Sequence, residues 1–445
     1  MYRNIFAFLF IILLSFQVIA QRLRISNDQR FIVYSDGKPF FWLGDTAWEL
    51  FHRLTREEAD LYLENRAQKG FNVIQAVVLA ELDGLQTPNA YGQTPFEGID
   101  PTKINEAYFE HVDYIVNKAN ELGMFVGMLP TWGDKFSRMW GVGPVVFNAN
   151  NAFEYGKFIG KRYKDKKIIW IMGGDRNPTG EGHMQIIRSM AKGIKEEVGR
   201  TQLFTYHPQG GSNSAMWFHN DDWLDLNMFQ SGHGEINNQN YRITTHIYNL
   251  PTTKPVVDGE PCYEDHPVNW RAENGWFDDF DSRRAGWWSM MAGACGHTYG
   301  NHNIWQMWQP GRDPISVSRT PWQESIDYPG AFQAGYMKSF FENLDWQKLV
   351  PNSEIVKSGP NTNGMEILAS TASDGSFLVA YSPYGANFSL DLSDMAEGNL
   401  GAQWFNPRLN NYILLGKIKK GENVVFDPPS DAKRGNDWVL LISVE

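Results

Sequence analysis

The chain has 445 residues, with 40 lysines and arginines against 51 aspartates and glutamates, and its formal net charge is −11. No basic run stands out, which gives no reason to expect a nucleic acid or an anionic lipid surface as a partner. The 17 Trp, 18 Tyr and 28 Phe exceed what a core needs, and exposed aromatic rings in exported proteins often stack on sugar rings. For any single tryptophan, burial in the core is the simpler interpretation.

Residues 1–20 have the pattern of a secretory signal peptide. Arg3 provides the positive start, residues 5–14 the apolar stretch, and Val18-Ile19-Ala20 the cleavage site. The apolar stretch is shorter than the roughly 20 residues that a membrane-spanning helix needs. We therefore expect an exported protein, periplasmic or extracellular, that has no membrane contact after cleavage and is a monomer.

The only cysteines are Cys262 and Cys295. A chain of this size does not need a disulfide, so the sequence favours two buried free thiols over a bridge. No cysteine and histidine spacing suits a metal ion, and we expect no cofactor.

Eight apolar runs alternate with helical segments between about residues 40 and 345. The runs cover residues 41–45, 71–78, 124–129, 168–173, 203–207, 226–230, 255–260 and 296–300. Between them, Thr55 and Glu58 match a capping box, and Gly70 lies where that helix should end. Eight strand–helix units predict an α/β fold, a closed (β/α)8 TIM barrel over residues 21–350, in which the fifth and sixth units are weakly helical.

The segment after residue 350 has a different pattern. Short alternating runs separated by turn clusters such as Asp374-Gly375 predict an antiparallel β-sandwich domain over residues 351–445. We expect this domain mainly to support the barrel, so that its deletion gives insoluble protein. Before the barrel, residues 24–37 predict a hairpin that either caps the barrel floor or joins the sandwich.

Two carboxylates follow buried strand runs: Asp175 follows the fourth run, and Glu260 closes the seventh. In a (β/α)8 barrel, side chains at the carboxyl ends of the strands face the mouth, where active sites lie. Two such carboxyl groups are the minimum for cleaving a glycosidic bond, because one protonates the leaving oxygen and the other acts as nucleophile or base. In retaining barrels the fourth strand usually supplies the acid/base and the seventh the nucleophile.

Other polar and aromatic residues near strand ends are predicted to bind an oligosaccharide or polysaccharide substrate, because a sugar site needs donors and acceptors around aromatic rings. They are Asp45, Trp48, Gln75, Trp132, Arg176, His207, Gln230, His233, His297, Tyr299 and Asn301. Residues 82–101 and 132–146 are predicted to form rim loops that close the mouth and favour attack on chain ends.

Three motifs resemble those of a known family: Gly44 to Trp48, Trp170 to Asn177, and Asp258 to Glu264. They resemble the apiosidase-like catalytic domain of glycoside hydrolase family 140 over roughly residues 25–350, and the tail resembles the sandwich domain, labelled as collagen-binding, that often follows it. The resemblance implies a retaining glycosidase that releases apiose from side chains of the pectin rhamnogalacturonan II. It places Asp175 on the family's acid/base and Glu260 on its nucleophile.

Neighbouring acids compete for these roles. Asp258 lies two residues before Glu260, on the same side of a regular strand, and is an alternative nucleophile. Asp45 suits a hydroxyl-binding or structural role, and Glu264 and Asp265 are expected to be solvated loop charges. The alternative functions are a non-catalytic carbohydrate-binding protein, a hydrolase of arabinofuranosides or other pectic side chains, and a polymer-binding tail for which the barrel is a scaffold.

Overall fold

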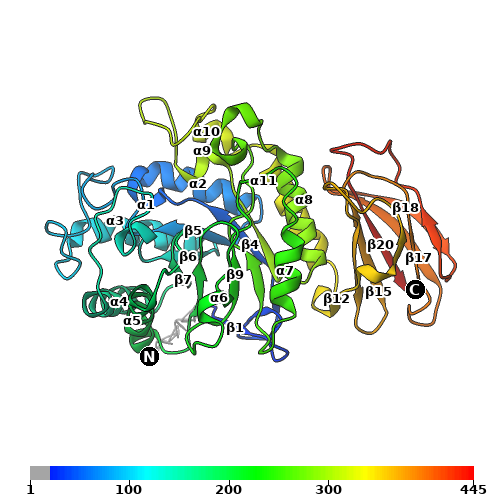
Figure 1. The fold of residues 1–445 in the computed structure, drawn as a ribbon, viewed down its shortest axis with the longest axis horizontal. Coiled ribbons are helices and arrows are strands. Elements are labelled where there is room, and N and C mark those ends of the chain that lie inside the picture. The colour runs from blue at the N-terminus through cyan, green and yellow to red at the C-terminus, as the bar shows by residue number, and fades with distance from the viewer. Residues whose placement is uncertain (1–20, 445) are drawn as a thin grey trace, which may run out of the picture.

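The computed structural model describes residues 21–444, so the predicted signal peptide lies outside the described residues. A curled parallel sheet surrounded by helices forms the larger part of the molecule, and an antiparallel domain lies beside it (Figure 1). Within residues 21–444, no helix is both long enough and apolar enough to cross a membrane.

Eight parallel strands follow one another in the order that the sequence predicts. They are β4 (Trp42–Thr46), β5 (Val73–Val77), β6 (Phe125–Leu129), β7 (Ile168–Gly173), β8 (Leu203–His207), β9 (Asn227–Phe229), β10 (Val256–Asp258) and β11 (Gly296–Tyr299). Six of them form one sheet in the order β11-β4-β5-β6-β7-β8, and β9 pairs separately with β10. The arrangement is consistent with an α/β barrel, but the ladder is not continuous around eight strands. Because β9 and β10 have only three residues each, few backbone groups are available at the two junctions.

The helices between and after the parallel strands lie around the curled sheet (Figure 1). They are α1 (Leu50–Arg53), α2 (Arg56–Gln68), α3 (Glu106–Glu121), α4 (Ala149–Tyr163), α5 (Glu181–Val198), α6 (Ala215–Phe218), α7 (Asn240–Tyr248), α8 (Asp279–Met291), α9 (His302–Trp305), α10 (Trp322–Ser325) and α11 (Pro329–Glu342). Thr55 and Glu58 form the predicted capping box at the start of α2. The helices of the fifth and sixth units, α6 and α7, are short, as their weak periodicity indicates.

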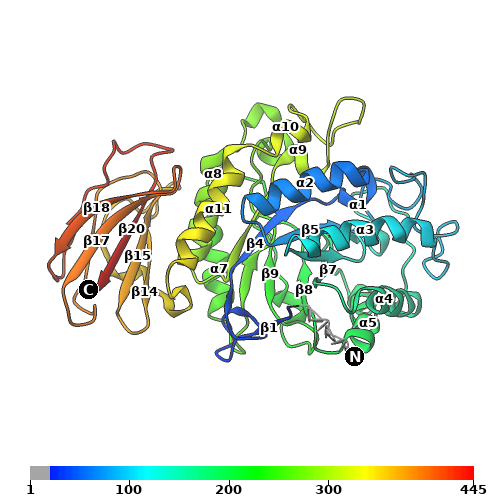
Figure 2. The ribbon, with the colours of Figure 1, turned by 180° about the vertical axis from the view of Figure 1, so that it is seen from behind.

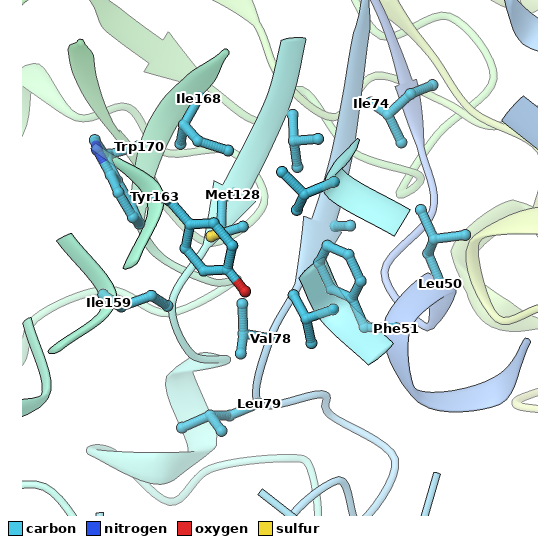
Figure 3. Packing of buried hydrophobic residues seen from close by; sticks show 14 of the residues in the cluster. Leu50, Phe51, Ile74, Val78, Leu79, Met128, Ile159, Tyr163, Ile168 and Trp170 are labelled. Carbon is cyan, nitrogen blue, oxygen red and sulfur yellow. The ribbon is translucent and has the colours of Figure 1, made fainter. Parts of the chain in front are cut away.

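Apolar side chains fill the space between this sheet and its helices. Met128 of β6 and Trp170 of β7 belong to one buried cluster with Ile159 and Tyr163 of α4 and Phe51 of α1 (Figure 3). Each such side chain stabilises the fold by about 1.5–3 kcal/mol relative to exposure. This core makes the strand ends a rigid base for the loops that follow them.

The N-terminal segment caps the base of the parallel sheet. Strands β1 (Leu23–Ile25), β2 (Ile32–Tyr34) and β3 (Pro39–Phe40) form their own antiparallel sheet. The Phe40 ring packs edge-on against Phe125, the first residue of β6, with ring centroids 5.5 Å apart. The sequence leaves open whether this hairpin caps the floor of the parallel sheet or joins the C-terminal domain, and in the structure it caps the floor.

The C-terminal part forms two antiparallel sheets, in the orders β12-β14-β15-β20-β17-β18 and β13-β16-β19. Its strands are β12 (Leu349–Pro351), β13 (Val356–Ser358), β14 (Leu368–Ala372), β15 (Phe377–Ser382), β16 (Phe388–Leu390), β17 (Leu400–Asn406), β18 (Asn411–Ile418), β19 (Val424–Phe426) and β20 (Trp438–Val444). A separate apolar cluster, which includes Leu390, Trp404 and Leu440, holds the two sheets together. The predicted antiparallel β domain is confirmed.

Helices α8 and α11 lie between the parallel sheet and the antiparallel domain (Figure 2). The buried Arg283 of α8 forms an ion pair with the buried Asp437, at 2.7 Å from Nη2 to Oδ1 and 2.8 Å from Nε to Oδ2. The Trp287 ring stacks on Tyr381, with centroids 5.7 Å apart. A buried charge pair and aromatic rings therefore join the C-terminal domain to α8.

Both cysteines are buried free thiols, as the sequence favours. Burial raises the pKa of Cys295 to about 12, so this thiol stays protonated and unreactive.

Candidate active site

A cavity of about 1000 Å³ opens where the parallel strands end. The segment after each of the eight strands contributes to its lining: Trp48, Glu81, Trp132, Asp175, Gln209, Gln230, Glu260 and Trp305, in the order β4 to β11. Ligand sites usually have volumes of roughly 300–1000 Å³. The cavity therefore has room for more than one sugar ring.

Glu260 is held at both of its carboxylate oxygens. Nε2 of His233 lies 3.0 Å from Oε1. Nε2 of His207 lies 3.0 Å from Oε2, although its direction is off that of a straight hydrogen bond. The backbone before Glu260 is also fixed, because the Gln75 side-chain amide donates to the carbonyl oxygen of Gly259 at 2.8 Å. The carboxylate is therefore fixed in position before any ligand binds.

Asp175 leaves β7 through a tight turn in which Gly173, Gly174 and Asp175 have φ angles of 94°, 109° and 48°. A Cβ atom at Gly173 would lie 2.6 Å from the carbonyl oxygen of His207, so only glycine fits there. The turn directs the carboxyl group into the cavity, where the Trp140 indole N–H donates to Oδ2 at 2.6 Å.

His207 links the two carboxyl groups. Its Nδ1 accepts the backbone N–H of Asp175 at 3.1 Å, so a neutral ring carries its proton on Nε2. Because Nε2 lies 3.0 Å from Oε2 of Glu260, a proton there favours the ionised form of this carboxylate. The His207 ring also lies against Trp48, with centroids 5.3 Å apart, and Trp48 lies against Trp132 at the same distance. One imidazole thus contacts the turn that carries Asp175 (residues 173–175, the acid turn), the Glu260 carboxylate and the aromatic ring of Trp48.

The environment moves the two pKa values in opposite directions. Burial, followed by the charge of Glu260, raises the pKa of Asp175 to about 7. Burial also acts to raise the pKa of Glu260, but the His207 and His233 imidazoles outweigh it and lower this pKa to about 2. Near neutral pH the site therefore holds one protonated acid and one carboxylate, the pair that acid-assisted bond cleavage requires.

The comparisons with known proteins agree with this geometry. Residues 26–348 match the family described as "Apiosidase-like, catalytic domain". The chain belongs to this family and is a glycoside hydrolase. Residues 350–443 match the family described as "Putative collagen-binding domain of a collagenase". The resemblance that the motifs indicate is confirmed, in its family and in its domain order.

Solved structures support the same assignment. One described as a glycoside hydrolase is 32% identical with a TM-score of 0.87, and the alignment covers 96% of this chain and 97% of that one. A glycoside hydrolase family 5 structure from Bacteroides vulgatus ATCC 8482 is 30% identical with a TM-score of 0.87, over 95% of this chain and 93% of that one. A structure from the same source, described as "a putative glycoside hydrolase", is 15% identical with a TM-score of 0.70 over 96% of this chain and 83% of that one, and it shows the shared fold alone. A search of curated protein sequences finds no match.

Several predicted substrate-binding residues of this apiosidase-like enzyme line the cavity, and others lie next to it. Trp48, Trp132, Gln230 and His233 line it. His207, Gln75 and Arg176 are buried and act on the cavity through their neighbours. Arg176 holds the Trp140 loop from behind, since its guanidinium lies 4.2 Å from the Trp140 ring centroid.

Four residues predicted to bind substrate do not line the cavity, and for Asp45 the structure has the structural role that the sequence left open. Asp45 points away from the cavity to α2, where it accepts hydrogen bonds from Tyr62 and Arg66. His297 lines a separate small cavity between α8 and α11. Tyr299 donates to Glu264 at 2.5 Å, and Asn301 caps α9. Asp45, His297 and Tyr299 leave their strands on the helix side, and Asn301 lies beyond the end of β11.

The expectation that Glu264 and Asp265 are solvated is wrong. Glu264 is buried and accepts the backbone N–H of Gly330 at 3.1 Å, and Asp265 is buried beside Arg319. Burial raises the pKa of Glu264 to about 8, which makes it a neutral structural acid at pH 7. The alternative nucleophile Asp258 is fully buried, where Ser231 donates to it at 2.6 Å, and it does not line the cavity.

The sequence interpretation missed several residues that line the cavity: Glu81, Trp140, Tyr263, Trp270 and Trp305. Trp140 lies in one of the two segments predicted as rim loops, and Glu81 lies next to the other. Length and composition therefore locate these loops but do not tell which of their side chains line the cavity. Glu81 and Glu235 are further carboxyl groups of the cavity, and burial and the charge of Asp175 raise the pKa of Glu81 well above the usual range. Among residues 21–444, no group of three or more His, Cys, Asp or Glu side chains is arranged to hold a metal ion.

Proposed function

We propose that this glycoside hydrolase is an exported, monomeric, retaining enzyme that releases terminal apiose from rhamnogalacturonan II-type side chains of plant pectin, in the periplasm or outside the cell. Asp175 is the acid/base and Glu260 the nucleophile. In this proposal the eight parallel strands act as one (β/α)8 barrel, residues 21–350 form the catalytic domain, and residues 351–445 support it.

The proposed reaction has two steps. In the first, a Glu260 oxygen attacks the anomeric carbon, the bond to the leaving oxygen breaks, and the Asp175 proton moves to that oxygen. In the second, Asp175 takes a proton from water while the water oxygen attacks the anomeric carbon and releases Glu260. Each residue ends the cycle in the protonation state in which it began.

One observation carries this proposal: two carboxyl groups of one cavity are held in opposite protonation states. Burial keeps the proton on Asp175, and two imidazoles keep Glu260 ionised. A site that only binds sugars has no need of such a difference. The pair therefore supports catalysis over simple carbohydrate binding.

The lining supports a neutral sugar as the released group. Among the described residues that line the cavity there is no lysine or arginine, so no side-chain cation faces the carboxylate of a uronic acid. The buried Trp132 Nε1 and Gln230 Oε1 atoms have no hydrogen-bond partner among residues 21–444. They are a donor and an acceptor that sugar hydroxyls can satisfy, beside the apolar faces of Trp48 and Trp132.

The test is to incubate the mature chain with rhamnogalacturonan II oligosaccharides and to measure free apiose by mass spectrometry. We expect release by the wild type, no release by Glu260→Gln, and wild-type release by Glu121→Gln, a matched control on the exposed surface of α3. Release of arabinose from arabinofuranosides in place of apiose would move the proposal to that substrate. Full activity of Glu260→Gln would refute the assigned roles.

A further inference from the structure

Trp140 is a cavity residue to which the family motifs assign no role. It lies on the loop after β6, its side chain is 37% exposed, and it lines the cavity together with Gly141 and Val142. Its indole nitrogen contacts the proposed acid/base directly, because it donates to Oδ2 of Asp175 at 2.6 Å. A surface tryptophan is thus part of the environment of the reacting proton.

A single guanidinium holds Trp140 and the acid turn together. Arg176 donates from Nη2 to the carbonyl oxygen of Trp140 at 2.7 Å and from Nη1 to that of Asp175 at 3.0 Å. Its Nε donates to the carbonyl oxygen of Ser137 at 2.9 Å. The Trp140 ring also covers this guanidinium at 4.2 Å from the ring centroid. The distance between the indole and the carboxyl group is therefore set by a rigid support.

Asp134 fixes the other end of the same loop. Its Oδ2 accepts the backbone N–H of Gly143 at 2.8 Å, and both its oxygens pair with Lys135 at 2.8 Å. Gly141 has a φ of 84°, and a Cβ atom there would lie 2.7 Å from Oδ2 of Asp134. The loop is built to hold one conformation, with the indole directed at Asp175.

The indole bond makes the two oxygens of Asp175 unequal. The carbonyl oxygen of a carboxylic acid accepts hydrogen bonds better than its hydroxyl oxygen does, so the Trp140 N–H favours Oδ2 as carbonyl and leaves the proton on Oδ1. Once the proton has been donated, the same N–H stabilises the carboxylate. The bond thus works in both protonation states, and it works most strongly in the charged one.

We propose, building on the function proposed above, that Trp140 is a positioning residue for the acid/base: its indole N–H holds Oδ2 of Asp175 so that the proton is transferred from Oδ1 to the leaving oxygen. The proton leaves Oδ1 as the glycosidic bond breaks, and water returns one to Oδ1 in the second step. Trp140 forms no bond with the sugar in this role.

Other charged groups act on Asp175 as well. Glu260 and Glu81 face it from the loops after β10 and β5 and favour its neutral form, whereas His207 of β8 and Arg176 favour its ionised form. The substitution Trp140→Phe leaves all of these in place and keeps an aromatic ring beside Arg176, but it removes the N–H donor and one ring of the indole. A second Trp→Phe change in the same cavity is therefore needed to separate the hydrogen bond from the lost ring.

The first experiment compares two classes of substrate. With a sugar leaving group, which needs the proton, we expect Trp140→Phe to lower kcat/KM about tenfold, the effect of one hydrogen bond to a charged group. With a 4-nitrophenyl glycoside of the same sugar, whose leaving group needs little acid assistance, we expect kcat/KM, which reports the first step alone, to change less than about twofold. The alkaline limb of the kcat/KM profile should move upward by up to about one pH unit, because the lost bond favours the carboxylate.

Trp270→Phe is the matched control. Trp270 also lines the cavity and is 45% exposed, but no carboxyl group accepts a hydrogen bond from its indole in the described structure. We expect this variant to leave the alkaline limb unmoved and to change kcat/KM by the same factor for both substrates. If Trp140→Phe lowers activity equally on both substrates and leaves the alkaline limb of the kcat/KM profile unmoved, Trp140 only lines the cavity and the proposal is overturned.

A second measurement does not require activity. In protein labelled with 15N-tryptophan, the indole resonance that is missing in Trp140→Phe should titrate with the ionisation of Asp175 in the wild type, and should not titrate in Asp175→Asn. If this resonance does not shift with pH in the wild type, and does not shift on Asp175→Asn substitution, the proposal is overturned even if the enzyme is active. A titrating resonance in a protein that cleaves none of the tested glycosides would keep the indole contact and refute the proposed substrate instead.

Discussion

Replacing the acid/base by its amide should stabilise the protein at alkaline pH. In the folded state the pKa of Asp175 is raised to about 7, mainly by burial and then by the charge of Glu260. Between its ordinary value near 4 and pH 7, the folded chain keeps a proton that the unfolded chain has released. Stability attributable to this group is therefore complete below about pH 4 and is lost as pH rises through 7. Asp175→Asn has no charge to lose.

The size of the effect follows from the difference between the two pKa values. About three pH units at about 1.4 kcal/mol each set an upper bound of about 4 kcal/mol. Since Asp175 borders an open cavity and is part-exposed, solvent screening reduces this, and we expect Asp175→Asn to be about 2 kcal/mol more stable than the wild type at pH 8. The backbone permits the change, because Asn adopts the φ of 48° at this position as readily as Asp does.

Thermal unfolding at pH 4.5 and pH 8 is the assay. We expect the melting temperatures of the two proteins to agree at pH 4.5, and that of the variant to be roughly 2–4 °C higher at pH 8. A variant that is less stable than the wild type at pH 8, or equally displaced at both pH values, would show that Asp175 is not held as a buried acid. The proposed assignment of acid and nucleophile would then lose its main support.

Three further predictions concern the two carboxyl groups of the cavity, His233, and the ion pair between α8 and the C-terminal domain. The kcat/KM of the wild type should be bell-shaped, with an alkaline limb near pH 7 from Asp175 and an acid limb far below pH 4 from Glu260, measured on any glycoside that the enzyme cleaves. His233→Phe should raise the acid limb by about one pH unit and leave the alkaline limb in place, because only Glu260 loses a partner; an unmoved acid limb would contradict this. Asp437→Asn should destabilise the protein by about 3 kcal/mol in chemical unfolding, because the buried Arg283 loses its buried charge partner and keeps only the half-buried Asp279 at Nη1, whereas Arg283→Met with Asp437→Leu should recover most of the loss.

Hydrophobic patterning predicted the strands and long helices well, because burial on both faces leaves a signal in the sequence itself. All eight runs between residues 41 and 300 are parallel strands, and the capping box at Thr55 starts α2. In the C-terminal domain the sequence predicts strands at residues 366–369, 377–381, 389–392, 423–426 and 438–442, and it misses β12, β13, β17 and β18. The outer strand β18 is largely exposed, so it has no apolar alternation to detect.

The direction of side chains at strand ends was harder to predict. Successive residues of a strand face opposite sides of the sheet, and a sequence does not say which side faces the interior and which faces the helices. In β11, Thr298 faces inward and bonds Trp42, while its neighbours His297 and Tyr299 face the helices. Asp45 of β4 is directed outward in the same way.

Loop residues are set by contacts that have no period. Trp140 reaches the acid turn only because Arg176 and Asp134 hold its loop, and these partners lie up to 36 positions away in the sequence. Glu264 and Asp265 follow a strand, and the sequence predicts that they are solvated charges. In the structure the loop folds inward, so that Glu264 contacts the start of α11 and Asp265 pairs with Arg319. Long-range packing decides both cases, and local sequence carries no trace of it.

The central claim is that Glu260 attacks the sugar while Asp175 supplies the proton. Its most direct test is to react the enzyme with activated 2-deoxy-2-fluoro glycosides of apiose and arabinofuranose, and to map the labelled peptide by mass spectrometry. We expect a single glycosyl ester on Glu260, and no label in Glu260→Gln. A label on Asp258 or Asp175, or turnover by direct attack of water with inversion at the anomeric carbon, would contradict the assignment.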